Sequence, residues 1–307
     1  MSPVRTTGKV RVSRLQGERH MASDQLTPDK WYTEIYPDDG AAFSLQIKDR
    51  IHEEQTEYQY LEIFETEKFG RLMTLDGLVM LTDRDNFIYH EMMTHPALFT
   101  HPDPKRVVVI GGGDCGCVKE VLKHPVETVI QIELDERVTR VSEEYFPALC
   151  TANNDPRARF EFTDGIKWME QASDGEYDVI IIDSTDPVGP ALGLFSTEFY
   201  QTCHRALGDQ GVLIAQSESP LFHQHIIQDV NRNMKAAGFA HRAVLQFAQC
   251  VYPSGWWTAT LASKAVAPSD FREAAAHNKD FETAYYNAPI HRGAMATPEF
   301  LRKLLAD

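Results

Sequence analysis

The residues best suited to chemistry follow apolar runs, at points where buried strands would end. Gly111-Gly112-Gly113-Asp114 follows the run Arg106–Ile110, and glycines at such a turn allow a ligand to approach the backbone closely. Glu133 ends the next run about 20 residues later, where a carboxylate can accept hydrogen bonds from both ribose hydroxyls. A glycine loop alone also fits a tight strand–helix turn, but together with Glu133 it indicates a nucleoside site.

Acidic residues distinguish this pattern from a phosphate-binding one. Asp114 stands where a pyrophosphate would approach the start of a helix, and its charge would repel that group. It suits a cationic ligand better, such as the sulfonium nucleoside S-adenosylmethionine or a relative. Asp164-Gly165 ends the third run, where the carboxylate could accept from the exocyclic amine of adenine or could cap the next helix.

Two further acids, Asp183 and Asp186, follow the fourth apolar run within the segment Asp183-Ser184-Thr185-Asp186-Pro187-Val188-Gly189-Pro190. Ligands of parallel α/β sheets bind beyond the carboxyl ends of the strands, where both acids would lie. The pair could cap a loop, or it could bind and deprotonate an amine. A carboxylate among other acids in a partly desolvated site has a raised pKa and can accept that proton.

Aromatic residues elsewhere could complete a cationic site. Tyr89 and His90 lie on a helix expected from Asp85 to about Phe99, which Pro96 could interrupt. Trp257 follows Tyr252-Pro253-Ser254-Gly255. Aromatic faces bind alkylammonium chains, although each of these residues alone would more often be a core aromatic or a surface histidine.

Together these motifs resemble the polyamine aminopropyltransferases, and specifically the bacterial spermidine synthases. The resemblance extends from about Trp31 to Leu305. The segments that carry it are Asn86–His95, Gly111–Asp114, Asp183–Pro190, Tyr252–Trp257 and Tyr285–His291.

The resemblance implies that an amine attacks the methylene carbon beside the sulfonium of decarboxylated S-adenosylmethionine, and that 5′-methylthioadenosine leaves. The amine expected for this bacterial pattern is putrescine, with cadaverine or spermidine as alternatives. A methyltransferase that uses intact S-adenosylmethionine and a homologue that only binds nucleosides or polyamines are further alternatives. Decarboxylated S-adenosylmethionine would be a co-substrate, and neither a permanently bound cofactor nor a metal is expected.

The same resemblance assigns roles to individual residues, with Asp183 as the proton acceptor. The residues implied in binding the amine and the aminopropyl group are Tyr89, His90, Asp114, Ser184, Asp186, Tyr252 and Trp257. The residues implied in binding the nucleoside are Gln59, Gly111, Gly112, Gly113, Glu133, Asp164, Gly165 and Pro190.

The elements that must position these residues alternate in the middle of the chain. Continuous apolar runs of the kind buried on both faces of a sheet occur at Arg106–Ile110, Thr128–Ile132, Arg159–Phe162, Tyr177–Ile182 and Gly211–Ala215. Helix-like segments lie between them near 116–124, 136–147, 165–172, 196–207 and 222–237. This alternation predicts an α/β protein with a doubly wound parallel sheet, and the resemblance specifies a methyltransferase-like Rossmann sheet with a small N-terminal β domain.

Shorter strand-like runs flank this region. Before it, Ala42–Ile51, Tyr58–Thr66 and Arg71–Leu75 are separated by turn signals, and Asp76-Gly77 predicts a tight hairpin to Leu78–Thr82. After it, strand-like runs return between Ala240 and Lys264. We therefore expect a basic, disordered extension at 1–30, an N-terminal β-strand domain at 31–84 and a Rossmann-like catalytic domain at 85–307.

The charge of the chain agrees with a cationic ligand but does not require one. The 307 residues include 45 acids against 30 Lys and Arg, a formal net charge of −15, with 43% hydrophobic residues. This composition argues against a disordered chain and against a nucleic-acid partner, because phosphate binding needs concentrated Lys and Arg. Residues 1–20 carry five basic residues and one acid, a net +4, so the remainder carries −19.

Localisation and assembly follow from weaker signals. The basic segment has no apolar core of a secretory signal, and no run reaches the ~20 apolar residues of a membrane span, so no membrane partner is expected. The five scattered cysteines indicate reduced thiols in the cytoplasm. The resemblance adds a homo-oligomer, either a dimer or a tetramer.

One residue departs from the family pattern. The glycine loop commonly continues Gly-Gly-Asp-Gly-Gly, and Cys115 replaces the next glycine here. We expect Cys115 to have an ordinary helical φ, with a thiol pKa lowered by the start of the helix and a tendency to oxidise.

Overall fold

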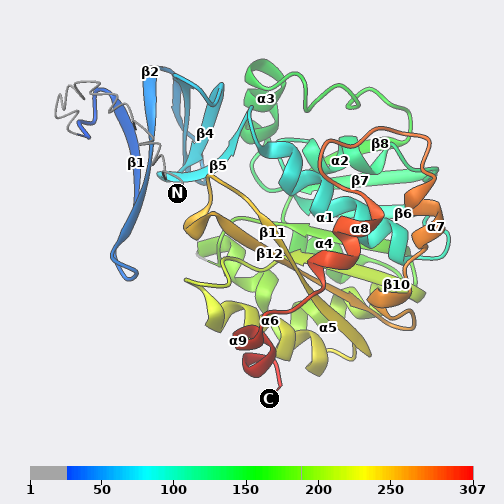
Figure 1. The fold of residues 1–307 in the computed structure, drawn as a ribbon. Helices are drawn as coiled ribbons and strands as arrows, with labels where there is room; N and C mark the ends of the chain where they lie inside the picture. The colour runs from blue at the N-terminus through cyan, green and yellow to red at the C-terminus, as the bar shows by residue number, and fades with distance from the viewer. Residues whose placement is uncertain (1–25, 188, 307) are drawn as a thin grey trace, which may run out of the picture.

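The computed structural model describes residues 26–187 and 189–306, with the side chain of Pro190 also left undescribed, and its strands form two sheets within that part of the chain (Figure 1). The N-terminal sheet is antiparallel and follows chain order. Its strands are β1 (Trp31–Tyr36), β2 (Ala41–Gln55), β3 (Tyr60–Thr66), β4 (Arg71–Leu75) and β5 (Leu78–Thr82). The extension expected at 1–30 falls almost entirely outside the described residues.

The β4–β5 hairpin was predicted from its turn and is confirmed. Asp76 and Gly77 both have positive φ, 51° and 78°, as the tight turn of a two-residue hairpin requires. Strand β1 was not predicted. Its residues form a strand by pairing with β2, in a register that places Trp31 opposite Gln46. What makes this segment a strand is therefore its pairing with β2, which its own sequence does not reveal.

The larger sheet has the order β11-β12-β10-β9-β6-β7-β8. Its parallel strands are β6 (Arg106–Gly111), β7 (Thr128–Glu133), β8 (Ala158–Phe162), β9 (Tyr177–Asp183) and β10 (Leu207–Gln216). Strands β11 (His241–Ala248) and β12 (Trp256–Ser263) are antiparallel to their neighbours, so the sheet is mixed at one edge. The predicted α/β fold is confirmed. Strands β7 and β8 follow β6 towards one edge of the sheet, and β9 and β10 are added on its other side, so the order of strand addition reverses between β6 and β9 as in doubly wound proteins.

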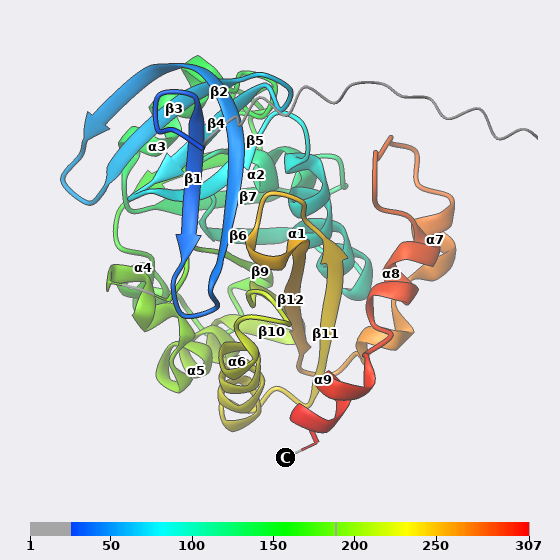
Figure 2. The same cartoon turned by 60° about the vertical axis from the view of Figure 1, so that its left-hand side comes forward.

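Helices cover both faces of this sheet (Figures 1 and 2). The helices of the described residues are α1 (Asn86–Thr100), α2 (Gly116–Val121), α3 (Glu136–Tyr145), α4 (Gly165–Gln171), α5 (Thr197–Ala206), α6 (Gln224–Ala236), α7 (Glu273–His277), α8 (Ala288–Ala294) and α9 (Glu299–Leu304), with 3₁₀ turns η1 (Gly189–Phe195), η2 (Pro253–Gly255) and η3 (Pro268–Asp270). One buried cluster joins α1, α2 and α8 to one face, and another joins α4, α5 and α6 to the other. Because both faces are covered, β6 is a continuous run in which Val107, Val108 and Val109 are fully buried.

Helix α1 passes through Pro96 without ending, so the predicted interruption is wrong. Residues 89–100 of this helix are all buried, and this packing outweighs the hydrogen bond that the proline nitrogen cannot donate. A segment near the C-terminus of the chain also holds helix α1 in place. The buried carboxylate of Glu91 accepts the backbone N–H groups of Ala284, Tyr285 and Tyr286 at 2.7, 2.8 and 2.7 Å. The Tyr285–His291 motif therefore anchors the helix that carries Tyr89 and His90.

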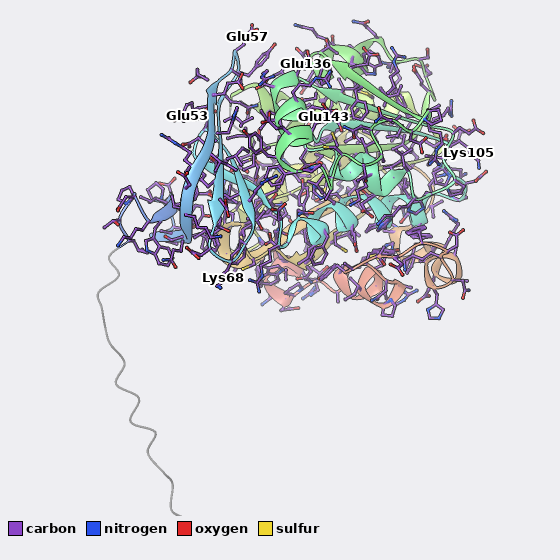
Figure 3. The ribbon with its side chains drawn as sticks, turned by 90° about the horizontal axis from the view of Figure 1, so that it is seen from above. Glu53, Glu57, Lys68, Lys105, Glu136 and Glu143 are labelled. Atoms are coloured by element: carbon purple, nitrogen blue, oxygen red, sulfur yellow. The ribbon has the colours of Figure 1, made fainter. Side chains whose placement is uncertain are left out.

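The surface accounts for a large part of the acidic excess. Figure 3 shows Glu57 at the tip of the β2–β3 hairpin and Glu136 and Glu143 along α3, and all three side chains are exposed. In the described part of the chain, none of the helices combines the length and the apolar character needed to cross a bilayer.

Candidate active site

A cavity of about 450 Å³ lies at the carboxyl ends of β6, β7 and β9, at the point where the order of strand addition reverses. The loop Gly111–Asp114 after β6, Glu133 at the end of β7 and the segment 183–186 after β9 form its polar side. The β4–β5 region of the N-terminal sheet covers it with apolar side chains, which are those of Met73, Leu75, Leu78, Met80 and Leu81. The cavity therefore has an acidic floor and an apolar cover.

The glycines of the loop bring two carboxylates close to the backbone. Gly112 has a φ of 67°, and a Cβ atom there would lie 2.8 Å from Oδ2 of Asp183. A Cβ atom at Gly113 would lie 2.8 Å from Oε2 of Glu133. Contacts this short leave no room for a side chain, so the glycines are required by the approach of Asp183 and Glu133.

Cys115 differs from both expectations. Its φ is 69°, in the left-handed region, so the predicted helical φ is wrong. The neighbouring Cys150 thiol and then burial raise the pKa of the Cys115 thiol, so the predicted lowering is wrong as well. A family glycine at this position is explained by the positive φ, which glycine adopts without strain. The Nδ2–H of Asn153 donates to the Cys115 sulfur at 3.4 Å, and this contact offsets part of the rise in the thiol pKa.

Asp183 and Asp114 form the centre of the acidic floor. The hydroxyl of Tyr89 donates to Oδ1 of Asp183 at 2.7 Å, whereas Oδ2 is buried without a hydrogen-bond partner among the described residues. Burial and then the negative charge of Asp114 raise the pKa of Asp183, and His90 and Tyr89 oppose this only in part. A carboxylate with a raised pKa and a free oxygen is suited to accepting a proton.

His90 acts on this centre from behind Asp114. Its Nε2 lies 2.9 Å from Oδ2 of Asp114, and the carboxylate can only accept, so the imidazole donates. Burial lowers the pKa of His90, but the charge of Asp114 and the hydrogen bond to it outweigh burial, and the net pKa is raised. The imidazole therefore holds the Asp114 side chain in place at the start of α2.

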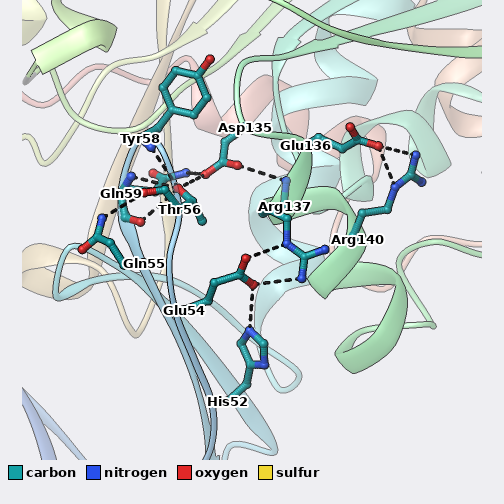
Figure 4. Close-up of polar contacts among 10 residues, drawn as sticks. All are labelled: His52, Glu54, Gln55, Thr56, Tyr58, Gln59, Asp135, Glu136, Arg137 and Arg140. Carbon is teal, nitrogen blue, oxygen red and sulfur yellow. Dashed lines mark hydrogen bonds and ion pairs between the residues drawn. The ribbon is translucent and has the colours of Figure 1, made fainter.

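The opposite end of the cavity carries the residues expected to bind a nucleoside. Burial raises the pKa of Glu133 to about 7, and its Oε1 accepts the Asp135 N–H at 2.9 Å. Asp164 caps α4 by accepting the Ile166 N–H at 2.9 Å, and it also lines the cavity, so both of its predicted roles are compatible with its position. The β2–β3 region reaches this end too, because Gln59 and Thr56 donate to Oδ2 of Asp135 at 2.9 and 2.7 Å (Figure 4).

A second acidic group, which the sequence analysis missed, surrounds Asp186. A small cavity of about 40 Å³ adjoins the larger one, and Glu34, Asp186 and Gln216 contribute to its lining. Burial raises the pKa of Asp186 to about 8, of Glu34 to about 7 and of Glu218 to about 6. Glu218 could have been found from its position two residues after the end of β10, but nothing in the sequence around Glu34 connects β1 with this site.

The structure brings most of the predicted residues together. Those that line the larger cavity are Gln59, Tyr89, Gly111, Gly112, Gly113, Asp114, Glu133, Asp164, Gly165, Asp183, Ser184, Asp186 and Tyr252. His90 lies behind Asp114, and Trp257 lines only the small cavity, where its ring packs edge-on against Tyr252 with centroids 4.7 Å apart. The side chain of Pro190 lies outside the described part of the structure.

The two cavities share one electrostatic property. Aspartate and glutamate side chains line both, and no Lys or Arg side chain of residues 26–187 and 189–306 is among the lining residues. Within the same described ranges, no three His, Cys, Asp or Glu residues are grouped so that they could hold a metal ion. Such a site favours ligands with positive charge over anions.

Comparisons with known protein families agree with this arrangement. Residues 86–273 match the spermine/spermidine synthase domain, and residues 30–83 match the spermidine synthase tetramerisation domain. The chain is 60% identical over 277 residues to a polyamine aminopropyltransferase of Thioalkalivibrio sulfidiphilus. The aligned region covers 90% of this chain and 97% of that protein. It is 58% identical over 278 residues to the one of Methylococcus capsulatus, with 90% and 97% covered.

Solved structures show the same fold. A spermidine synthase in complex with the transition state analogue AdoDATO superposes with a TM-score of 0.87 at 36% identity, covering 91% of this chain and 96% of the other. The spermidine synthase of Thermotoga maritima superposes with a TM-score of 0.85 at 37% identity, covering 90% and 94%. The mixed sheet with an N-terminal β unit is therefore an arrangement that these enzymes share.

Proposed function

The chain belongs to the spermine/spermidine synthase family of aminopropyltransferases, and we propose that it transfers an aminopropyl group from decarboxylated S-adenosylmethionine to putrescine. The products are spermidine and 5′-methylthioadenosine. The observation that carries this proposal is the pair of adjoining cavities with several carboxylates and no Lys or Arg among their described lining residues. Both reactants are cations, and they would meet where Asp114, Asp183 and Asp186 converge.

In the proposed reaction Asp183 accepts a proton from the attacking ammonium group of putrescine. The raised pKa of Asp183 and its unpartnered Oδ2 support this role. The neutral amine then attacks the methylene carbon beside the sulfonium, the carbon–sulfur bond breaks, and the sulfur keeps the electron pair. Because the sulfonium carbon loses a neutral thioether, which is a good leaving group, the protein contributes mainly orientation and deprotonation.

The remaining predicted residues bind the two substrates in this proposal. Asp114 holds the ammonium of the aminopropyl group, and Glu133 and Asp164 hold the ribose and the adenine. Tyr89 and Tyr252 border both cavities and would flank the carbon chain of the amine. No cofactor would remain bound between turnovers.

The small cavity is where we place the distal ammonium of the amine. Its volume is about 40 Å³, and Asp186, Glu34, Trp257 and Pro253 are among its lining residues. A four-carbon diamine would place its first nitrogen near Asp183 and its second among these acids. Cadaverine differs by one methylene, which an apolar slot discriminates by only ~1–3 kcal/mol.

The test combines purified protein with putrescine and either decarboxylated or intact S-adenosylmethionine. Release of methylthioadenosine with the decarboxylated donor supports the proposal, and turnover with the intact donor alone would refute it. Asp183→Asn should lower kcat by ~10²–10⁴, the usual range for loss of a general base. Asp178→Asn is the matched control, because Asp178 lies at the other end of β9, where it accepts the N–H groups of Lys105 and Arg106.

Assembly as a homo-oligomer, a dimer or a tetramer, is part of the same proposal. The N-terminal sheet matches a tetramerisation domain, and its edge strand β1 carries Ile35 with 68% of its surface exposed. Light scattering should give a mass above that of one chain, and Ile35→Asp should reduce it. We also place the enzyme in the cytoplasm, where its five unpaired cysteines would stay reduced.

A further inference from the structure

His223 contacts the second acidic group from outside the cavity. Its Nδ1 lies 2.9 Å from Oε2 of Glu218, whose side chain is only 1% exposed. The Nε2–H of Gln216 reaches Oε1 of the same carboxylate at 3.1 Å. An ionised carboxylate can only accept, so Nδ1 of His223 carries the proton in this contact.

Glu218 is held in an unusual backbone conformation to make these contacts. Its φ is 70°, which costs a residue other than glycine on the order of 1 kcal/mol or more. Thr258 fixes the backbone, because both its N–H and its hydroxyl donate to the Glu218 carbonyl, at 3.0 and 2.9 Å. Strain that is maintained by several contacts marks a side chain whose direction matters.

The side chains of Glu218 and Asp186 are close enough to shift each other's pKa. The contact raises the pKa of Asp186 and lowers that of Glu218, although burial raises both. Glu218 has the lower pKa of the two, and its carboxylate accepts from Gln216 and contacts His223. Glu218 is therefore the member of the pair that carries a negative charge first as the pH rises.

We propose that His223 is a positioning residue that gives the enzyme its preference for an amine with a second, distal ammonium group. By donating to Glu218, it keeps the Asp186–Glu218 pair negatively charged beside the place where that ammonium would lie. This inference rests on the proposed aminopropyl transfer to a diamine.

Gln216 also donates to Glu218 and lowers its pKa, but it is a neutral amide, and the remaining titratable groups around the pair are acids or tyrosines. Glu34 and Tyr36 face it from β1, and Glu34 adds a further acid whose own pKa is raised by burial and by Asp186. Tyr252 faces it from the β11–β12 connection. Among the described residues that line the small cavity, none is a Lys or Arg. Among the side-chain contacts of Glu218 in the described structure, His223 therefore supplies the one imidazole.

The experiment compares putrescine with n-butylamine, which has the same four-carbon chain without the distal ammonium. Methylthioadenosine release from decarboxylated S-adenosylmethionine gives kcat and KM for both amines with the full-length enzyme. The variants are His223→Phe, which removes the donor, and His223→Asn, which keeps an N–H donor near the position of Nδ1. His225→Phe is the matched control, because this neighbouring histidine is exposed and lines neither cavity.

We expect His223→Phe to lower kcat/KM for putrescine about tenfold or more, the effect of losing a hydrogen bond to a charged group, and to leave butylamine unchanged. His223→Asn should lie closer to the wild type, and His225→Phe should match it. An equal loss with both amines, or an unchanged putrescine-to-butylamine ratio, would overturn the inference and leave the proposed function intact. Failure of the wild type to use either amine would instead overturn the proposed function, and this inference with it.

Discussion

Tyr89→Phe tests the proton acceptor without removing it. In the folded protein the Tyr89 hydroxyl donates to Oδ1 of Asp183 at 2.7 Å, and this contact lowers the pKa of Asp183 against the larger effect of burial. The substitution keeps the ring, which packs edge-on with Tyr252 and Phe247, so the wall of the cavity should persist. With the donor gone, the pKa of Asp183 should rise further and its ionised fraction should fall.

The magnitude follows from the strength of the lost contact. A hydrogen bond to a charged group contributes about 1.5–3 kcal/mol, which corresponds to roughly a tenfold to hundredfold change in the population of the ionised form. The assay is kcat/KM for putrescine as a function of pH. On the acid side kcat/KM should fall by that factor, the acid limb should move to higher pH, and at high pH the variant should approach the wild type.

Tyr252→Phe is the control for this experiment. Tyr252 borders the same cavities, but its hydroxyl donates to the Met80 carbonyl at 2.5 Å rather than to Asp183. Its loss should change KM more than the position of the acid limb. If Tyr89→Phe lowers the rate equally at every pH, the hydroxyl does not act through the protonation of Asp183, and the reasoning is refuted.

Three further predictions concern stability. Cys115→Gly should be about 1 kcal/mol more stable than Cys115→Ala in urea unfolding, the reverse of their helix propensities, because φ is 69° at this position; equal stability would show that the conformation carries no strain. Glu91→Gln should lose about 1.5–3 kcal/mol by the same measurement, because one amide oxygen cannot replace a carboxylate that accepts three N–H groups; wild-type stability would contradict this role. The pKa of Asp186 is raised to about 8 in the folded state, so its contribution to stability is present below about pH 4 and is lost as the pH rises to about 8. Asp186→Asn should therefore flatten the fall in Tm across that window, and a slope identical to that of the wild type would count against the assignment.

Much of the fold was predictable because its signals are local. The buried runs of the parallel strands, the Asp76-Gly77 turn and the helical spacing predicted over 85–99 each lie within one segment, and all have counterparts in the structure. Strand β1 was missed because it depends on pairing with β2. The effect of Pro96 was misjudged because burial of the surrounding helix, which no local pattern reports, decides whether a helix tolerates a proline.

The site divides in the same way. Acids at strand ends were found because the topology of a doubly wound sheet brings the carboxyl ends together at one edge. The conformation of Cys115 was misjudged because the resemblance supplied a residue type at that position and no φ. Glu34, Gln216 and His223 were not found. Glu34 comes from β1, far along the chain from Gln216 at the end of β10 and His223 at the start of α6, and no motif links the three.

The sequence by itself determined which chemistry the protein carries. Asp114, Asp183 and Asp186 at the ends of buried strands, with no basic residue in the same motifs, favoured a cationic ligand before any packing was known. Only the tertiary structure decided how those acids are charged. Burial and the charges of neighbouring carboxylates raise the pKa values of Asp183 and Asp186, and both effects depend on contacts between segments that the chain order leaves far apart.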